Sequence, residues 1–200
     1  VIKNVPYSCS ETRFRPLLNL PETQKIILYQ GALNMGRGLE LMIDSLKYLK
    51  NHLLVLAGDG DITAQLKLRV TRNHLEDRVK FTGKLLPDEL IKLTHQADLG
   101  LSLEEDLGLN YRFCLPNKVF DYIHAGIPVL VSKLPLLEEL LNQYKIGECL
   151  NTRNPKSLAV AIEKMIVNKS DYLHDLEKAA TDLNWNHEKK TLIEFIKKID

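Results

Sequence analysis

Short apolar runs alternate with longer amphipathic segments along most of the chain. Lys25–Gln30, His52–Ala57 and residues 127–132 are almost continuously apolar, which is typical of strands buried on both faces. Segments with apolar residues at helical spacing lie between them, as over residues 39–49. Strands separated by helices pair in parallel through right-handed crossovers. We therefore predict an α/β fold, a Rossmann-like doubly wound parallel sheet of about six strands with helices on both faces.

The other expected elements continue this alternation and then change it. Further strands are expected over residues 79–82, 98–103 and 147–150, and helices over 62–74, 87–96, 116–125 and 134–144. Residues 104–115 form a polar connection that is long for a compact domain, which makes it a candidate functional loop. After residue 154 only helices are expected, over 155–167, 170–183 and 186–199. The pattern predicts a helical C-terminal extension.

Charge and cysteine content exclude several classes of protein. The chain has 27 Lys and Arg against 26 Asp and Glu. This balance does not indicate the clustered positive charge of a protein that binds nucleic acid. No apolar run approaches the roughly 18 residues of a membrane span, so membrane association is not indicated. Cys9, Cys114 and Cys149 are far apart and lack metal-ligand spacing. We predict reduced thiols, no metal site and a cytoplasmic location.

Residues 1–6 do not resemble a signal peptide and lack an initiator Met, so we expect a processed chain or an excised fragment.

A glycine-rich loop follows the first expected strand. Gly31, Gly36 and Gly38 allow backbone amides to approach a ligand, and the start of the next helix favours phosphate. Arg37 is suited to clamp phosphate oxygens. The loop is a poor dinucleotide fingerprint, because Leu41 stands where a third small residue is expected. A turn carrying an exposed arginine is the alternative interpretation.

The expected helix over residues 116–125 carries a second set of candidate residues. Asn117 and Lys118 lie in its first turn, where free amides and a cation can bind a diphosphate together. Asp121 lies one turn later on about the same face, and its carboxylate can accept hydrogen bonds from both hydroxyls of a ribose. The alternative is that all three residues only cap and solvate the helix.

These residues lie in stretches that resemble a known family. Residues 115–132 (LPNKVFDYIHAGIPVLVS) look like the donor-binding signature of GT-B glycosyltransferases, most closely the retaining family 4 group, also called glycosyl transferases group 1. Residues 31–38, 56–60 (LAGDG), 79–83 (VKFTG) and 97–98 agree with that family in the same order. The resemblance extends over nearly the whole chain from about residue 25.

The resemblance implies roles for the individual residues. Arg37 takes the place of the basic residue that meets the donor diphosphate, and Asp121 that of the acidic residue, usually Glu, that binds the ribose. Asn117 and Lys118 lie on the helix that faces the donor phosphates. One position departs from the family, because Ala32 stands where an arginine is common.

The acidic loop at residues 104–108 matches the family segment whose carboxylate approaches the donor sugar. We expect Glu105 to be that carboxylate, with Glu104 and Asp106 as alternatives. The spacing from this loop to Asp121 is longer than that between the two glutamates usual in the family. The register within the loop is therefore left open.

The resemblance also implies an architecture and a reaction. Residues 1–24 would be a linker from a missing N-terminal domain, 25–184 the donor-binding domain, and 185–200 a helix that contacts the missing domain. The full protein would transfer a sugar from a nucleoside-diphosphate sugar, with retention, to an acceptor sugar, lipid or polysaccharide. It would need no cofactor beyond this donor substrate, and the fragment alone would be inactive. A sugar-nucleotide epimerase or phosphorylase of the same fold, and a non-catalytic nucleotide-sugar-binding module, remain alternatives.

Overall fold

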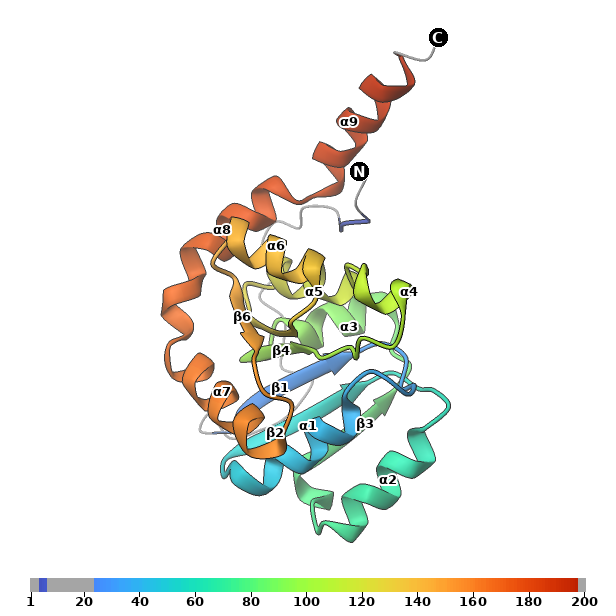
Figure 1. Ribbon diagram of the computed structural model, residues 1–200, viewed down its shortest axis with the longest axis vertical. Coiled ribbons are helices and arrows are strands. Elements are labelled where there is room, and N and C mark those ends of the chain that lie inside the picture. Colours follow the sequence, from blue (N-terminus) through green and yellow to red (C-terminus); the bar gives the residue numbers. More distant parts are fainter. Residues whose placement is uncertain (1–3, 7–23, 198–200) are drawn as a thin grey trace.

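A computed structural model describes residues 4–6 and 24–197. Its centre is a parallel sheet with the strand order β3-β2-β1-β4-β5-β6 (Figure 1). The strands are β1 (Lys25–Gln30), β2 (His52–Ala57), β3 (Val79–Gly83), β4 (Leu99–Ser102), β5 (Val129–Ser132) and β6 (Gly147–Leu150). The predicted doubly wound α/β fold is confirmed.

Helices connect these strands and extend beyond the last one. They are α1 (Leu39–Ser45), α2 (Thr63–Arg72), α3 (Pro87–Thr94), α4 (Leu109–Arg112), α5 (Asn117–His124), α6 (Pro135–Gln143), α7 (Pro155–Val167), α8 (Leu173–Asp182) and α9 (Trp185–Ile196). Short 3₁₀ turns also lie at Leu46–Tyr48 after α1, at Glu76–Arg78 after α2 and at Lys169–Tyr172 between α7 and α8. Two expectations change: the helix expected over residues 39–49 tightens to a 3₁₀ turn after Ser45, and the loop expected over 104–115 contains α4.

The helices form two layers around the sheet. On one face α1 packs against α2 and α7, and on the other α5 packs against α3 and α8 (Figure 1). The central strands are buried from both sides, and the side chains of Leu28 and Val55 are completely inaccessible to solvent. This burial explains why their sequences are continuously apolar instead of alternating.

Helix α5 lies unusually close to strand β4. A Cβ atom at Gly100 would overlap the ring of Tyr122, so only glycine permits this approach. The Tyr122 hydroxyl accepts a hydrogen bond from the main-chain N–H of Gln30 (3.2 Å), which ties α5 to the end of β1 as well. The first turn of α5 is thereby fixed beside the carboxyl ends of β1 and β4.

The carboxyl ends of β1 and β4 mark the point where the strand order reverses. From β1 the chain winds outward to β2 and β3, and from β4 it winds the other way to β5 and β6. The loops that leave β1 and β4 diverge and leave a crevice between them, which is the usual ligand site of open parallel sheets.

The C-terminal helix α9 runs away from the body of the domain (Figure 1). Its first residue, Trp185, donates its main-chain N–H to the carbonyl of Pro6 (2.9 Å), so the start of α9 meets the described residues that precede β1. Residues 7–23 and 198–200 lie outside the described residues. The predicted division at residues 1–24, 25–184 and 185–200 stays a prediction. Within the described ranges, no helix has the length and apolar character needed to span a bilayer.

Candidate functional site

A pocket of about 370 Å³ opens at the carboxyl end of β1, beside the start of α5. We call it the switch-point pocket. The predicted residues Gly31, Arg37, Asn117, Lys118 and Asp121 all line it. They come from the β1–α1 loop and from α5, segments that are separated by about 80 positions in sequence and are brought together by the strand order. Its remaining lining residues are Tyr29, Gln30, Ala32, Leu90 and Pro116.

A buried carboxylate organises the positive charge of this pocket. The Nζ atom of Lys118 lies 2.8 Å from Oε1 of Glu104, and Nη1 of Arg37 lies 3.6 Å from the same oxygen. The hydroxyl of Ser102 donates to Oε2 of Glu104 (2.7 Å). Burial alone would raise the pKa of Glu104, but the Lys118 charge and the two hydrogen bonds outweigh it and hold that pKa below its usual value. Glu104 therefore faces two cations and balances only one of them.

Aromatic rings hold the two cations in place. The Lys118 ammonium lies 3.9 Å from the ring centroid of Tyr29, and the Arg37 guanidinium lies 5.2 Å from that of Tyr111. Lys118 is almost fully buried, whereas the Arg37 side chain is 31% exposed. Lys118 is thus a fixed charge at the base of the pocket, and Arg37 can adjust at its mouth.

Asp121 lies on the same wall, one helical turn after Asn117. Its Oδ2 atom accepts a hydrogen bond from Nε2 of Gln30 (2.7 Å), and its Oδ1 atom has no hydrogen-bond partner among the described residues. Burial raises the pKa of Asp121, and His124 and the Gln30 hydrogen bond offset only part of this rise. Asp121 therefore presents one oxygen to a ligand, and ligand hydroxyls that donate to it stabilise its ionised form.

Two of the predicted glycines shape the loop instead of lining the pocket. Gly36 and Gly38 have φ angles of 76° and 71°, in the left-handed region that favours glycine. A Cβ atom on Gly38 would collide with the carbonyl of Leu103, and the Gly36 carbonyl accepts the main-chain N–H of Glu105 (2.8 Å). These glycines bring the β1–α1 loop against the β4–α4 loop. Their predicted contact with a ligand stays a prediction.

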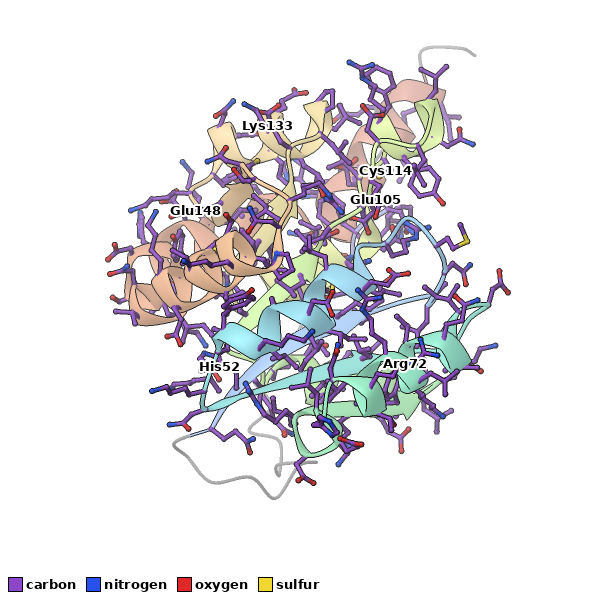
Figure 2. The ribbon with its side chains drawn as sticks, turned by 60° about the horizontal axis from the view of Figure 1, so that its bottom comes forward. His52, Arg72, Glu105, Cys114, Lys133 and Glu148 are labelled. Carbon is purple, nitrogen blue, oxygen red and sulfur yellow. The ribbon has the colours of Figure 1, made fainter. Side chains whose placement is uncertain are left out.

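The other carboxylates of the acidic loop point elsewhere. Glu105 lies 3.6 Å from Arg153, and Asp106 lies 3.8 Å from Arg112. Glu105, Asp106 and Arg153 line a neighbouring pocket of about 370 Å³ beside Ser132. In Figure 2, Glu105 and Cys114 lie toward the upper part of the view, well apart from His52. The predicted approach of Glu105 to a donor sugar remains untested.

Sequence reasoning missed two residues that support the site. Arg153 donates to the Ser132 hydroxyl (2.7 Å) and to the Leu103 carbonyl (3.0 Å), so it links the ends of β4 and β5. Gln30 is the single polar residue at the carboxyl end of the otherwise apolar run IILYQ. Both residues follow or end a parallel strand at its carboxyl end, and this position is the signal in the sequence that could have identified them.

A second, more apolar pocket of about 270 Å³ adjoins the first. Gln30, Leu90 and Asp121 line both pockets, so the two are contiguous. Its remaining lining residues are Pro6, Pro87, Ile91, Thr94, His95, His124 and Ala125. A ligand with a charged end, a polar middle and a flat apolar end fits this sequence of surfaces.

Comparison with known proteins agrees with the fold. The family model for glycosyl transferases group 1 matches residues 10–183. The fold and the family match define a Rossmann-like domain of the GT-B glycosyltransferase type. The chain belongs to the glycosyl transferases group 1 family.

Curated relatives carry glycosyltransferase names and are much longer than this chain. An uncharacterized glycosyltransferase of Methanocaldococcus jannaschii is 28% identical over 158 residues, covering 76% of this chain and 38% of the relative. The alpha-monoglucosyldiacylglycerol synthase of Streptococcus pneumoniae is 24% identical over 187 residues, covering 90% of this chain and 40% of the relative. The chain spans about two fifths of the length of these relatives.

Solved structures share the fold at low identity. The HepE protein of Anabaena, solved with UDP and glucose, superposes with a TM-score of 0.73 at 20% identity, covering 88% of this chain and 48% of that one. Sucrose-phosphate synthase from Thermosynechococcus elongatus gives a TM-score of 0.77 at 20% identity, covering 90% and 47%. At this identity the likeness establishes the architecture alone.

Proposed function

We propose that this chain is the donor-binding domain of a retaining glycosyltransferase of family 4 and that it binds a nucleoside-diphosphate sugar. The observation that carries the proposal is the arrangement of the switch-point pocket, where the cations Arg37 and Lys118 lie on the same wall as the carboxylate of Asp121. Positive charge suits a diphosphate, and a carboxylate suits the vicinal hydroxyls of a pentose.

The two contiguous pockets give the donor an orientation. In this proposal the diphosphate lies at Arg37, Lys118 and the first turn of α5, where Asn117 adds a free main-chain amide. The pentose lies at Asp121, and the base extends into the apolar pocket beside Leu90. HepE, which was solved with UDP and glucose, has the same fold and is consistent with a donor of this class.

The same residues are placed to assist the transfer. The bond between the anomeric carbon and the phosphate oxygen breaks as the acceptor hydroxyl oxygen forms its own bond to that carbon. Negative charge grows on the leaving diphosphate, which takes up the proton that the hydroxyl loses. Preorganised cations such as Lys118 and Arg37 stabilise that charge more in the transition state than in the bound donor.

The remaining features of the proposal concern the whole protein. A second domain would bind the acceptor sugar, lipid or polysaccharide, and its closure would exclude water from the anomeric carbon. The chain alone then binds the donor but transfers nothing. In this proposal the donor is a substrate and no further cofactor, metal or nucleic acid takes part, and the protein acts in the cytoplasm.

Nucleotide titration tests this proposal. UDP, GDP and ADP are titrated into the wild-type chain and into Asp121→Ala and Arg37→Ala by isothermal calorimetry. Both substitutions should weaken binding, and Asp121→Ala should do so by roughly 1–3 kcal/mol because it removes a charged hydrogen-bond acceptor. Asp77→Ala is the matched control, since Asp77 is exposed just before the amino end of β3, and it should bind as wild type does.

Two results would reject the proposal at different levels. If a nucleotide binds and neither Asp121→Ala nor Arg37→Ala weakens it, the site is assigned to the wrong residues. If the wild-type chain binds none of the three nucleotides at millimolar concentration, the domain does not bind a donor of this class.

A further inference from the structure

One buried side chain connects three elements of the site. Gln30, the last residue of β1, is only 3% exposed. Its Nε2 atom donates to Oδ2 of Asp121 on α5 (2.7 Å), and its Oε1 atom lies 2.9 Å from the hydroxyl of Thr94 on α3. Thr94 is itself buried. The chain Thr94–Gln30–Asp121 therefore runs from the second helix layer to the pocket.

Hydrogen-bonding chemistry fixes the direction of this chain. An ionised carboxylate only accepts, so the Gln30 amide must turn its NH₂ group toward Asp121. Its carbonyl oxygen then faces Thr94 and requires a donor there. The Thr94 hydroxyl supplies one, although its single hydrogen is also within reach of the Leu90 carbonyl (2.7 Å). The amide orientation is therefore set by Asp121, and the Thr94 hydroxyl supports it when its hydrogen is directed at the Gln30 carbonyl oxygen instead of at Leu90.

The result is a carboxylate held at one oxygen and open at the other. Gln30 binds Oδ2, Oδ1 has no hydrogen-bond partner among the described residues, and Asp121 lines both pockets. The cationic or titratable groups that line the two pockets with Asp121 are Lys118, Arg37 and Tyr29 in the switch-point pocket and His95 and His124 in the apolar one. Among the described residues, the side chain that hydrogen-bonds the Asp121 carboxylate is that of Gln30, which is not titratable.

We propose that Gln30, supported by Thr94, is a positioning residue that orients the Asp121 carboxylate toward the pentose hydroxyls of the bound nucleotide. This proposal rests on the proposed donor-binding function and adds to it. It assigns substrate recognition to a residue that needs no contact with the substrate. It also distinguishes Gln30 from an ordinary core residue, whose replacement would change stability but not the selectivity of binding.

The pH at which nucleotide affinity is lost distinguishes a positioning role of Gln30 from a purely structural one. A purely structural role would leave that pH unchanged. Burial raises the pKa of Asp121, and the Gln30 hydrogen bond opposes that rise. Pentose hydroxyls need an ionised acceptor, so nucleotide affinity falls as the pH drops through this pKa. Removing the Gln30 amide raises the pKa further, so affinity should be lost at a higher pH than in the wild type.

The experiment compares Gln30→Leu, Thr94→Val and Thr94→Ser with the wild-type chain. UDP, GDP, ADP and inorganic pyrophosphate are titrated into each between acid and neutral pH. Gln30→Leu should weaken nucleoside diphosphates on the order of tenfold and leave pyrophosphate unchanged, because only the nucleotide carries a pentose. Thr94→Val should give a smaller loss in the same direction, and Thr94→Ser, which keeps the hydroxyl, should bind as wild type does.

Several results would overturn the inference while leaving the donor site intact. One is a Gln30→Leu variant that binds nucleotides as tightly as wild type with the same acid dependence. Another is a Gln30→Leu variant that loses the same affinity for pyrophosphate as for nucleotide. A third is a Gln30→Leu substitution that lowers nucleotide affinity as much in the Asp121→Asn variant as in the wild-type chain. If Gln30→Leu does not fold, the isosteric Thr94→Val carries the same test. Failure of the donor site itself is recognised separately, because the wild type then binds no nucleotide.

Discussion

At the scale of single residues, the site depends on a buried ion pair that serves two purposes. Glu104 is fully buried and holds Lys118 at 2.8 Å, so each charge makes the other tolerable in the interior. The same contact fixes the Lys118 ammonium at the base of the pocket. Stability and ligand binding are therefore tied to the same two side chains, and substitutions can separate them.

Neutralising one partner should destabilise the fold, and neutralising both should restore it. Glu104→Gln leaves the Lys118 ammonium buried without its anion and should cost roughly 3–5 kcal/mol of unfolding free energy, measured by urea denaturation. Adding Lys118→Met should recover most of that loss. The double variant should still bind pyrophosphate more weakly than wild type, because its fixed cation is gone.

An exposed ion pair provides the control. Lys133 and Glu138 lie 3.7 Å apart with side chains 62% and 39% exposed, so Glu138→Gln should change stability by less than about 1 kcal/mol. If Glu104→Gln were equally mild, the buried pair would not hold the site together. If the double variant bound pyrophosphate like the wild type, Lys118 would have no part in binding the diphosphate.

At the scale of elements, the sequence predicts best where burial is strongest. The expected bounds of β1 and β2 coincide with those in the structure, because each strand has a continuous apolar run and is flanked by polar or glycine residues. Helix α4 could not be predicted, since its four residues are too few for a helical period. The 3₁₀ turn after α1 depends on tertiary packing and also left no pattern in the sequence.

The choice among the acidic residues shows what a pattern can decide once the fold is known. Side chains two residues apart point to the same face of a strand, so Gly100, Ser102 and Glu104 share one face. Gly100 faces Tyr122 of α5, and Glu104 accordingly meets Lys118 of the same helix. Glu105 falls on the other side, near Arg153. The sequence alone did not show which face α5 covers, so it left the three carboxylates open.

The close packing of α5 on β4 leads to a prediction at this scale. Gly100→Ala should destabilise the domain by several kcal/mol, because the added methyl overlaps the buried Tyr122 ring. It should also weaken nucleotide binding, since α5 carries Asn117, Lys118 and Asp121. Urea denaturation and calorimetry measure the two effects.

A second glycine provides the comparison for Gly100→Ala. Gly126 has open space around its Cβ position but a φ of 68°, so Gly126→Ala should cost only about 1 kcal/mol through backbone strain. Equal costs at Gly100 and Gly126 would contradict the packing argument.

At the scale of the whole molecule, the two edges of the sheet differ in the groups that they carry. The carboxyl edge carries the pocket, whereas the amino edge carries His52, the first residue of β2, which is 4% exposed. Neither ring nitrogen of His52 has a hydrogen-bond partner among the described residues, and Nδ1 lies 3.8 Å from Glu163 of α7. Burial lowers the pKa of His52, and the Glu163 charge opposes this only in part.

This depressed pKa makes the fold sensitive to mild acid. The unfolded chain, with a histidine pKa of about 6.5, binds the proton more readily than the folded chain does. The His52 contribution to stability is therefore complete above that value and is lost as the pH falls through the folded pKa. Urea denaturation from pH 8 to pH 5.5 should show a loss of up to about 1.4 kcal/mol per pH unit from this residue. His52→Leu should make that slope shallower, whereas replacing the exposed His174 by Gln should not.

Nucleotide affinity of the folded His52→Leu chain at neutral pH should equal that of the wild type, because His52 lies at the opposite edge from the pocket. A weaker affinity would show that the two edges are coupled.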